Sequence, residues 1–190
     1  AAKSAAQSLG YPVVLKALAP GVAHKAKAGL VETGIGDAAT LDAAYNSLAA
    51  RIAYLGCNFS DVPIILQPMV RSQAELFAGL TWEPPLGHFL IFGLGGVHTE
   101  ILDQVTLIPT GVDELTLRQR VEESIAGRIA VAAAGKDGGD LIASLVGVLS
   151  ALDRLAAWHG NVLESVDVNP LLVTNSGCLA VDALVTMHPP

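Results

Sequence analysis

The chain has 190 residues, of which 52% are hydrophobic and 15% charged, and its formal net charge is -7. This composition is typical of a well-packed globular protein and excludes a disordered chain. The negative balance, without any run of basic residues, argues against a nucleic-acid-binding surface. An anionic ligand would have to be bound by a few lysines, backbone amides and a metal ion.

The longest apolar runs are interrupted by glycine or charged residues before they reach about 18 residues, so we expect no membrane span. Cys57 and Cys178 match no metal-ligand spacing and are expected to be reduced, which is typical of a cytoplasmic protein. No signal peptide is visible. The opening AAKSAAQSLG resembles the last turns of a helix ending at Gly10, and this suggests a piece of a longer polypeptide.

The first part of the chain predicts three strands and a long helix. Strands are expected at residues 11–16, 30–35 and 62–70, each bounded by glycine or proline signals. The helix is expected between Asp37 and Gly56, where apolar residues recur at helical spacing. Pro68 inside the third strand predicts a sheet edge or a crossover point, because proline cannot donate to a strand ladder.

The second part predicts a hairpin around residues 84–87, extended structure at 97–108, and helices at 113–126 and 138–158. Residues 162–187 are interpreted as a strand, a break at Pro170, a second strand, a turn and a third strand. The sum predicts an α+β fold with mixed or antiparallel sheets. We expect two lobes, residues 1–70 and 71–190, with the boundary at 70–73.

The C-terminal stretch contains oxygen-bearing side chains at a spacing that suits a metal ion. Asp167 and Asn169 lie two apart on one strand and share a face, while Val166 and Val168 point the other way. If Asn175-Ser176 is a two-residue loop, Asn169 falls opposite Asp182. If Ser176-Gly177 is the loop, the two are diagonal neighbours at roughly 5 to 8 Å. A hard cation could bridge them; alternatively, Asn169 ends a strand and Asp182 faces water.

Two other features allow a functional and a structural interpretation. The glycines of GLGG, among them Gly95 and Gly96, follow an apolar strand and match neither a Rossmann fingerprint nor a P-loop. They form either a plain turn or a close backbone approach to an anionic ligand. Lys16 is either a surface lysine or a phosphate ligand. His24 is either an exposed histidine or a phosphoryl acceptor on a loop.

Four stretches of the sequence, taken in chain order, carry a resemblance to a known family. They are GYPVVLK with HK, VPIILQPMV, FGLGGVHTEIL, and VDVNPLLV with GCLAVDA. Together they resemble the ATP-grasp domain of NDP-forming (ADP-forming) acyl-CoA synthetases. This family is related to the succinyl-CoA synthetase β chain, and the resemblance runs from about residue 9 to 185. It implies an ATP-grasp fold in which two α+β lobes clasp ATP or ADP with Mg²⁺. It also implies an acid-thiol ligase that uses a phosphohistidine relay.

The resemblance implies roles for particular residues. Lys16 would reach the nucleotide phosphates, and His24 would carry the phosphoryl group. Asn169 and Asp182 would bind magnesium. The remaining nucleotide-binding residues would be Gln67, Met69, Val70, Glu75, Gly95, Gly96 and Glu100. The implied partners are CoA-binding and ligase domains on the same or another chain, CoA and a small carboxylic acid, in an oligomeric enzyme without nucleic acid or membrane.

The sequence departs from the family where charges are expected. Ala26 and Lys27 replace a small hydroxyl residue and an acid, and Pro68 replaces a glutamate. Ile108 and Leu184 replace basic residues. These losses leave open a second hypothesis, in which a catalytically degenerate module senses nucleotide or acyl-CoA, or scaffolds a fused partner such as an acetyltransferase domain.

Overall fold

The computed structural model describes residues 1–22, 24–96, 104–135 and 140–189. The chain divides into two compact units, Ala1–Val70 and Arg71–Pro190. Each unit has a hydrophobic core and a sheet of its own. The two units are therefore described one at a time.

The first unit is a small α+β layer. Its elements are α1 (Ala2–Leu9), β1 (Val13–Ala17), β2 (Val31–Ile35), α2 (Ala38–Tyr54), the short 3-10 helix η1 (Phe59–Asp61) and β3 (Ile64–Pro68). Helix α2 begins where the sequence predicts, because the Asp37 side chain accepts hydrogen bonds from the Ala39 and Thr40 backbone N–H groups. The end of α1 at Gly10 is also confirmed, with Gly10 at a φ of 82°.

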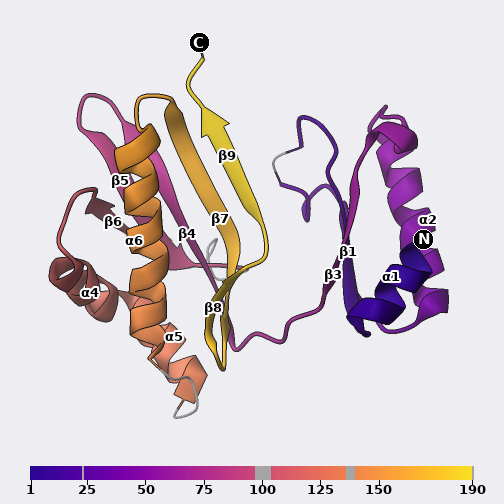
Figure 1. Ribbon diagram of the computed structural model, residues 1–190, viewed down its shortest axis with the longest axis horizontal. Helices are drawn as coiled ribbons and strands as arrows, with labels where there is room; N and C mark the ends of the chain where they lie inside the picture. Colours follow the sequence, from indigo (N-terminus) through magenta and orange to yellow (C-terminus); the bar gives the residue numbers. More distant parts are fainter. Residues whose placement is uncertain (23, 97–103, 136–139, 190) are drawn as a thin grey trace. The chain divides into compact units, whose positions relative to one another are not determined.

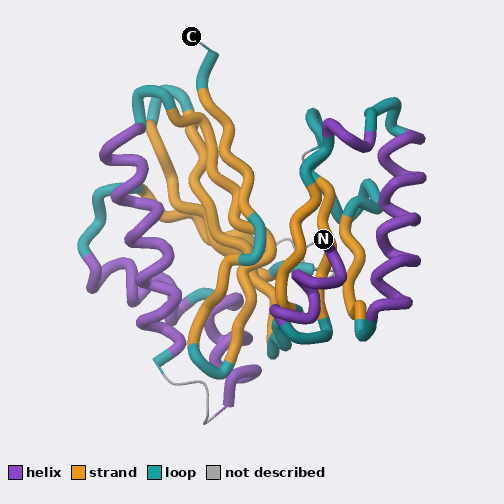
Figure 2. The backbone as a smooth tube through the Cα atoms, turned by 45° about the vertical axis from the view of Figure 1, so that its right-hand side comes forward, coloured by secondary structure: helices purple, strands orange, loops and turns teal. Residues whose placement is uncertain are grey.

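The sheet of the first unit has the order β2-β1-β3, and both pairings are antiparallel. Helices α1 and α2 lie on one side of it (Figures 1 and 2). Val13, Leu15 and Ala17 of the central strand β1 belong to the core beneath these helices. Pro68 is the last residue of β3, an edge strand, which confirms the edge prediction for this proline.

The second unit is built on a larger antiparallel sheet. Its elements are β4 (Ala74–Glu83), β5 (Gly87–Leu94), β6 (Val105–Pro109), α4 (Glu114–Glu123), α5 (Ile125–Ala134), α6 (Leu141–His159), β7 (Leu163–Thr174), β8 (Gly177–Ala180) and β9 (Ala183–Met187). The strand order is β6-β5-β4-β7-β8, and β9 also pairs with β7. The β4–β5 hairpin around residues 84–87 and the α+β fold class are confirmed.

Helices α4, α5 and α6 cover one face of this sheet (Figure 1). Their apolar residues form one core with alternate residues of the strands, such as Leu76, Ala78 and Leu80 of β4. Residues between these positions point to the opposite face, which we call the open face. By this alternation Glu75 and Phe77 of β4 belong to the open face.

Two sequence expectations about element boundaries are wrong. The helix expected at 113–126 ends at Glu123, because Ser124 is extended and its hydroxyl accepts from the Gly127 N–H to begin α5, a helix that the pattern did not predict. The break expected at Pro170 is absent: β7 runs through it. The ladder between β4 and β7 shifts register between Val168 and Leu171, so an irregularity accommodates the proline that cannot donate.

The sequence predicts no segment that could span a membrane, but helix α6 meets the criteria for one. By length and composition it is long and apolar enough to cross a bilayer, the one such helix among the described residues. Its apolar side is used inside the fold instead. Leu145, Leu149 and Leu152 are buried in the core against the sheet. A helix that packs its apolar side into the core of a globular unit can be as long and as apolar as a membrane-spanning helix.

Candidate functional site

The outer edge of β7 holds the pair that the sequence proposes as metal ligands. Leu171 pairs with Ala180 of β8, and Val168 pairs with Ala183 of β9. In an antiparallel pair, the numbers of facing residues have a constant sum, and the two pairs share that sum. The same register therefore continues between them and places Asn169 opposite Asp182. The turn is the two-residue loop at 175–176, flanked by Thr174 and Gly177, and the alternative loop at 176–177 is wrong.

Asn169 and Asp182 share the open face of the sheet. Val166 and Val168 are buried in the core beneath the helices, so Asp167 and Asn169 point the other way. Residues directly opposite in an antiparallel ladder point to the same side, with Cβ atoms about 4.5 to 5.5 Å apart. Asp182 Oδ1 accepts the Ala183 N–H at 3.0 Å, which helps to fix the carboxylate.

This donor set fits magnesium. Mg²⁺ prefers oxygen ligands, takes one or two of them from carboxylates, and fills its other positions with water and phosphate oxygens. One carboxylate and one amide oxygen on the same face of adjacent strands suit that requirement. Among the described residues, no group of three histidine, cysteine or acidic side chains could hold a metal by itself, so phosphate oxygens of a ligand would have to complete the shell.

Glu75, Gly95 and Gly96 meet where β4 begins and β5 ends. The Gly95 N–H donates to the Glu75 carbonyl at 2.8 Å and is thus used inside the sheet. A Cβ on Gly95 would lie 2.9 Å from the Leu76 carbonyl oxygen, and one on Gly96 would lie 3.0 Å from Glu75 Oε2. Gly96 also has a φ of 65°. Glycine at 95 therefore lets the two backbones approach closely, and glycine at 96 lets the backbone pass close to the Glu75 carboxylate.

Phe77 is an open-face residue that the sequence interpretation missed. It pairs with Gly93 of β5, and a Cβ on Gly93 would lie 2.5 Å from the Phe77 ring. The ring thus covers Gly93 of β5, while β4, the strand of Phe77, pairs on its other side with β7, which carries Asn169. A glycine opposite an aromatic residue across two neighbouring strands is the sequence signal that could have found this pair.

Lys16 belongs to the first unit and is buried, with 7% of its surface exposed. It lies on the central strand β1, between Val31 of β2 and Ile65 of β3. Because its neighbours Leu15 and Ala17 face the helices, its side chain leaves the opposite face of the sheet. The interpretation of Lys16 as a surface lysine is wrong. A buried ammonium at a fixed position is suited to binding an anion.

His24 is exposed on the loop that joins β1 to β2. Its carbonyl accepts the Ala28 N–H at 3.1 Å, and the Lys25 carbonyl accepts the Leu30 N–H at 2.9 Å. Arg51 of α2 donates from Nε to the Ala28 carbonyl at 2.6 Å. Sequence reasoning missed Arg51, since no local pattern links it to a loop more than twenty residues earlier.

The expected nucleotide-binding residues Gln67, Met69 and Val70 lie at the end of the first unit. Gln67 pairs with Val14 of β1 and is partly buried. Met69 follows the strand, donates its N–H to the Pro12 carbonyl at 2.9 Å and is 40% exposed. Val70 is partly buried and ends the unit. Glu100, the other residue of the expected nucleotide site, lies outside the described residues.

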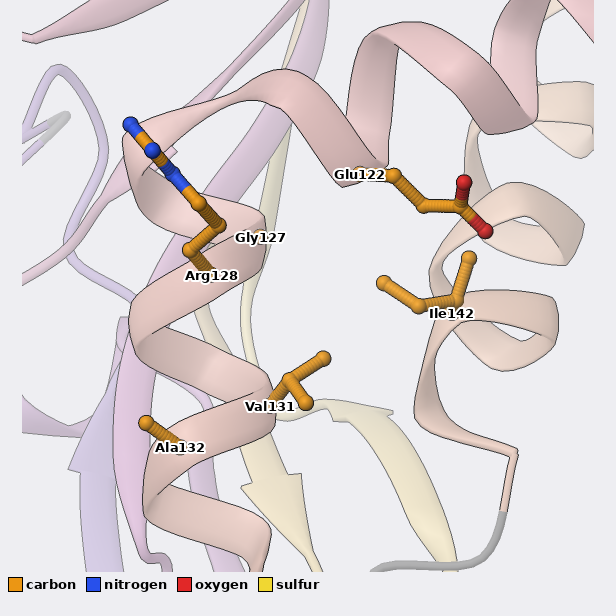
Figure 3. Close-up of a pocket in the computed structure, with 6 residues that line it drawn as sticks. All are labelled: Glu122, Gly127, Arg128, Val131, Ala132 and Ile142. Carbon is orange, nitrogen blue, oxygen red and sulfur yellow. The ribbon is translucent and has the colours of Figure 1, made fainter.

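A hollow of about 360 Å³ lies between α4, α5 and α6 of the second unit (Figure 3). It is lined by Glu122, Gly127, Arg128, Val131, Ala132 and Ile142. In Figure 3 the Val131 and Ile142 side chains approach each other across it. None of the residues predicted for the site lines this hollow, which belongs to the helical side of the unit.

Comparison with known proteins shows which family this chain resembles. Residues 1–187 match the family model of the ATP-grasp domain. The chain is 32% identical over 181 residues to acetate–CoA ligase [ADP-forming] I of Archaeoglobus fulgidus, covering 95% of this chain and 26% of the relative. It is 28% identical over 184 residues to the acetate–CoA ligase [ADP-forming] II β subunit of Pyrococcus furiosus, covering 96% of this chain and 78% of that subunit.

A solved structure supports the same assignment. The crystal structure of PH1788 from Pyrococcus horikoshii superposes with a TM-score of 0.85 and 28% sequence identity, covering all of this chain and 80% of the other. The chain spans about a quarter of the length of the Archaeoglobus ligase but most of the β subunit and of the solved chain. With the family match over residues 1–187, this chain belongs to the ATP-grasp family.

Proposed function

We propose that this chain is the nucleotide-binding domain of an NDP-forming acyl-CoA ligase. The whole enzyme joins a small carboxylic acid to CoA while ATP becomes ADP and phosphate. The observation that carries the proposal is the placement of Asn169 opposite Asp182 on the open face of the sheet. The names of the Archaeoglobus and Pyrococcus relatives, both ADP-forming ligases, support the same reaction class.

The nucleotide would be held by groups that neutralise or accept its phosphates. Lys16 supplies an ammonium at a fixed position, since its side chain is buried on a central strand. Asn169 and Asp182 would hold magnesium, which spreads the negative charge of the phosphate oxygens during transfer. Gln67, Met69 and Val70 would meet the adenine with their backbone. Glu75, Gly95, Gly96 and Glu100 complete the proposed binding residues.

His24 is proposed to carry the phosphoryl group between the nucleotide and the acyl-forming half of the enzyme. A lone pair on a neutral imidazole nitrogen forms the N–P bond while the bond between the γ-phosphorus and the ADP oxygen breaks. The ring then loses its other N–H proton to solvent. The phosphoryl group next passes to the carboxylate of the acid, and the sulfur of CoA displaces phosphate from the resulting acyl phosphate. The exposed position of His24 on a loop supports this role.

The acyl-forming steps need domains other than this one. The chain spans 26% of the Archaeoglobus ligase, and the Pyrococcus relative is named as a β subunit. We therefore propose that CoA-binding and ligase domains, on the same chain or on a partner chain, supply the sites for CoA and the acid. The complete enzyme would be a cytoplasmic oligomer.

One observation favours a second candidate, a degenerate module that binds nucleotide without turnover. Leu184, where the family has a basic residue, pairs with Asp167 on the strand next to the proposed metal site. Losing one charge-assisted contact costs about 1.5 to 3 kcal/mol. Several such losses together would stop phosphoryl transfer while some nucleotide affinity remains.

Two measurements on the full-length protein distinguish the active ligase domain from the degenerate module. Calorimetric titration with Mg-ATP and Mg-ADP is expected to show saturable binding under both. Incubation with Mg²⁺ and ATP labelled at the γ-phosphorus is expected to leave an acid-labile label on the ligase, and His24→Ala should abolish it. Saturable binding with no label would select the degenerate module. The absence of binding would reject both.

A further inference from the structure

The loop that carries His24 is folded on itself at its C-terminal side. Three backbone hydrogen bonds, from Ala28 N–H to the His24 carbonyl, from Gly29 N–H to the Ala26 carbonyl and from Leu30 N–H to the Lys25 carbonyl, close residues 24–30 into a compact turn. Leu30 is fully buried in the core of the first unit, and its carbonyl accepts the Ala17 N–H at 2.9 Å. One end of this turn is therefore fixed to β1.

The Arg51 side chain of α2 contacts the outer part of this turn. Arg51, in the last turn of α2, donates from Nε to the Ala28 carbonyl at 2.6 Å. A Cβ on Gly29 would lie 3.2 Å from the same nitrogen, so the guanidinium comes close to the glycine. The guanidinium carbon also lies over the Tyr54 ring, 5.4 Å from its centre.

These contacts give Arg51 a defined geometry although it is exposed. The guanidinium is planar and its Nε–H has one direction, so it fixes the Ala28 carbonyl more tightly than a flexible ammonium would. Gly29 has a φ of 70° and no side chain, which allows the close approach. The Ala28 N–H in turn bonds to the His24 carbonyl, and Arg51 is thereby linked to the histidine through one residue, Ala28.

We propose that Arg51 is a positioning residue for phosphoryl transfer, which fixes the turn from which His24 presents its imidazole. This inference rests on the proposed relay function of His24. In-line transfer requires the attacking nitrogen near the phosphorus at a defined angle, and a misplacement of about 1 Å can cost up to 100-fold in rate. Within the described residues, Arg51 contacts Ala28, Gly29 and Tyr54, none of which is assigned to the nucleotide. Its loss is therefore expected to slow transfer without weakening nucleotide binding.

The test measures His24 labelling in the full-length protein under single-turnover conditions with Mg²⁺ and γ-labelled ATP. Arg51→Ala is expected to lower the labelling rate about tenfold, with nucleotide Kd and Tm unchanged. Arg51→Lys is expected to be intermediate, since its ammonium can reach a carbonyl but lacks the fixed direction. Gly29→Ala, which pushes a methyl group toward the guanidinium, is expected to slow labelling as well.

Lys3→Ala is the matched control. Lys3 is an exposed cation of the same unit that also contacts α2, through an ion pair with Asp42 at 2.6 Å, in an early turn of the helix rather than in the last turn that carries Arg51. It is expected to label at the wild-type rate. If wild type labels His24 and Arg51→Ala labels equally fast, or if Kd rises as much as the rate falls, the positioning role is rejected. If wild type takes no label, the proposed relay itself fails.

Discussion

Asn169 lies directly opposite Asp182 across the outer edge of β7, at the point where β8 has ended and β9 has not yet begun. The interruption separates two ladders that keep a common register, and Val181 still donates to the Pro170 carbonyl at 3.4 Å. The pair thus occupies a gap in the strand pairing while both side chains stay on one face. This is the arrangement on which the proposed magnesium site depends.

Removing the charge of Asp182 should weaken binding of Mg-nucleotide but not of nucleotide alone. For Asp182→Asn we expect a loss of about 1.5 to 3 kcal/mol in Mg-ADP affinity, because a charge-assisted contact is lost. Calorimetry with Mg²⁺, and again with a chelator, measures the difference. Glu164→Gln, an exposed carboxylate on the same strand β7, is the control and should bind as wild type. An equal loss in both variants would contradict the metal role.

Replacing Lys16 should lower affinity for the nucleotide phosphates. Lys16→Met keeps the length of a buried side chain and removes its charge, so we expect about 1.5 to 3 kcal/mol less binding energy for ATP. Fluorescence titration with a labelled nucleotide measures the change. Lys3→Met, an exposed lysine in the same unit, controls for net charge. Unchanged affinity in Lys16→Met would remove this residue from the site.

Two helical glycines should respond in opposite directions to the same substitution. Nothing lies within 4 Å of a Cβ placed on Gly147 of α6, so Gly147→Ala should stabilise by about 0.5 to 1 kcal/mol. A Cβ on Gly127 of α5 would collide with the Val121 carbonyl and the Ser124 hydroxyl. Gly127→Ala should therefore destabilise by about 1 to 3 kcal/mol. Urea unfolding of the two variants tests both signs, and a shared sign would contradict this packing.

Stability of the first unit should depend on pH through the cap of α2. The backbone N–H and the hydroxyl of Thr40 hold the pKa of Asp37 below its usual range. A carboxyl with a lowered folded-state pKa stabilises above its unfolded pKa, about 3.9, and loses that contribution as pH falls through the folded value. Asp37→Asn keeps a capping side chain but cannot titrate. We expect its Tm deficit against wild type at pH 6 to shrink below about pH 4.

Asp61→Asn, an exposed carboxylate of the same unit that does not cap α2, controls for the change in net charge. Its Tm difference from wild type should not follow the Asp37 curve. A constant deficit for Asp37→Asn from pH 6 to pH 3 would show that the charge of the cap makes no contribution.

The sequence predicts best where local chemistry decides the structure. The Asp37 cap fixes the start of α2, Pro68 ends an edge strand, and the loop at 175–176, one of the two that the sequence allows, sets the pairing of the strands around it. Each signal lies within a few residues of its effect. The proposed ligands Asn169 and Asp182 are predicted on the same basis, since a two-residue turn determines which residues face each other.

Features that depend on contacts between residues far apart in the chain could not be predicted from the sequence. The burial of Lys16 requires strands on both sides of β1, and its sequence neighbours would suit an exposed position equally well. Pro170 continues β7 because the ladder with β4 shifts beside it. The bond from Arg51 to Ala28 joins a helix to a loop that precedes it in the chain. Such pairs are fixed by packing, which a single sequence does not display.

The short connection at Asn175 and Ser176 also limits which insertions and deletions this part of the chain can tolerate. One codon added to or deleted from the connection would slide every later residue by a single step and turn the Asp182 carboxylate away from Asn169. Substitutions there would be tolerated, whereas length changes would inactivate a cation site several residues away. The length of the connection therefore determines whether Asn169 and Asp182 face each other. This length should be kept among descendants of this protein that still bind nucleotides.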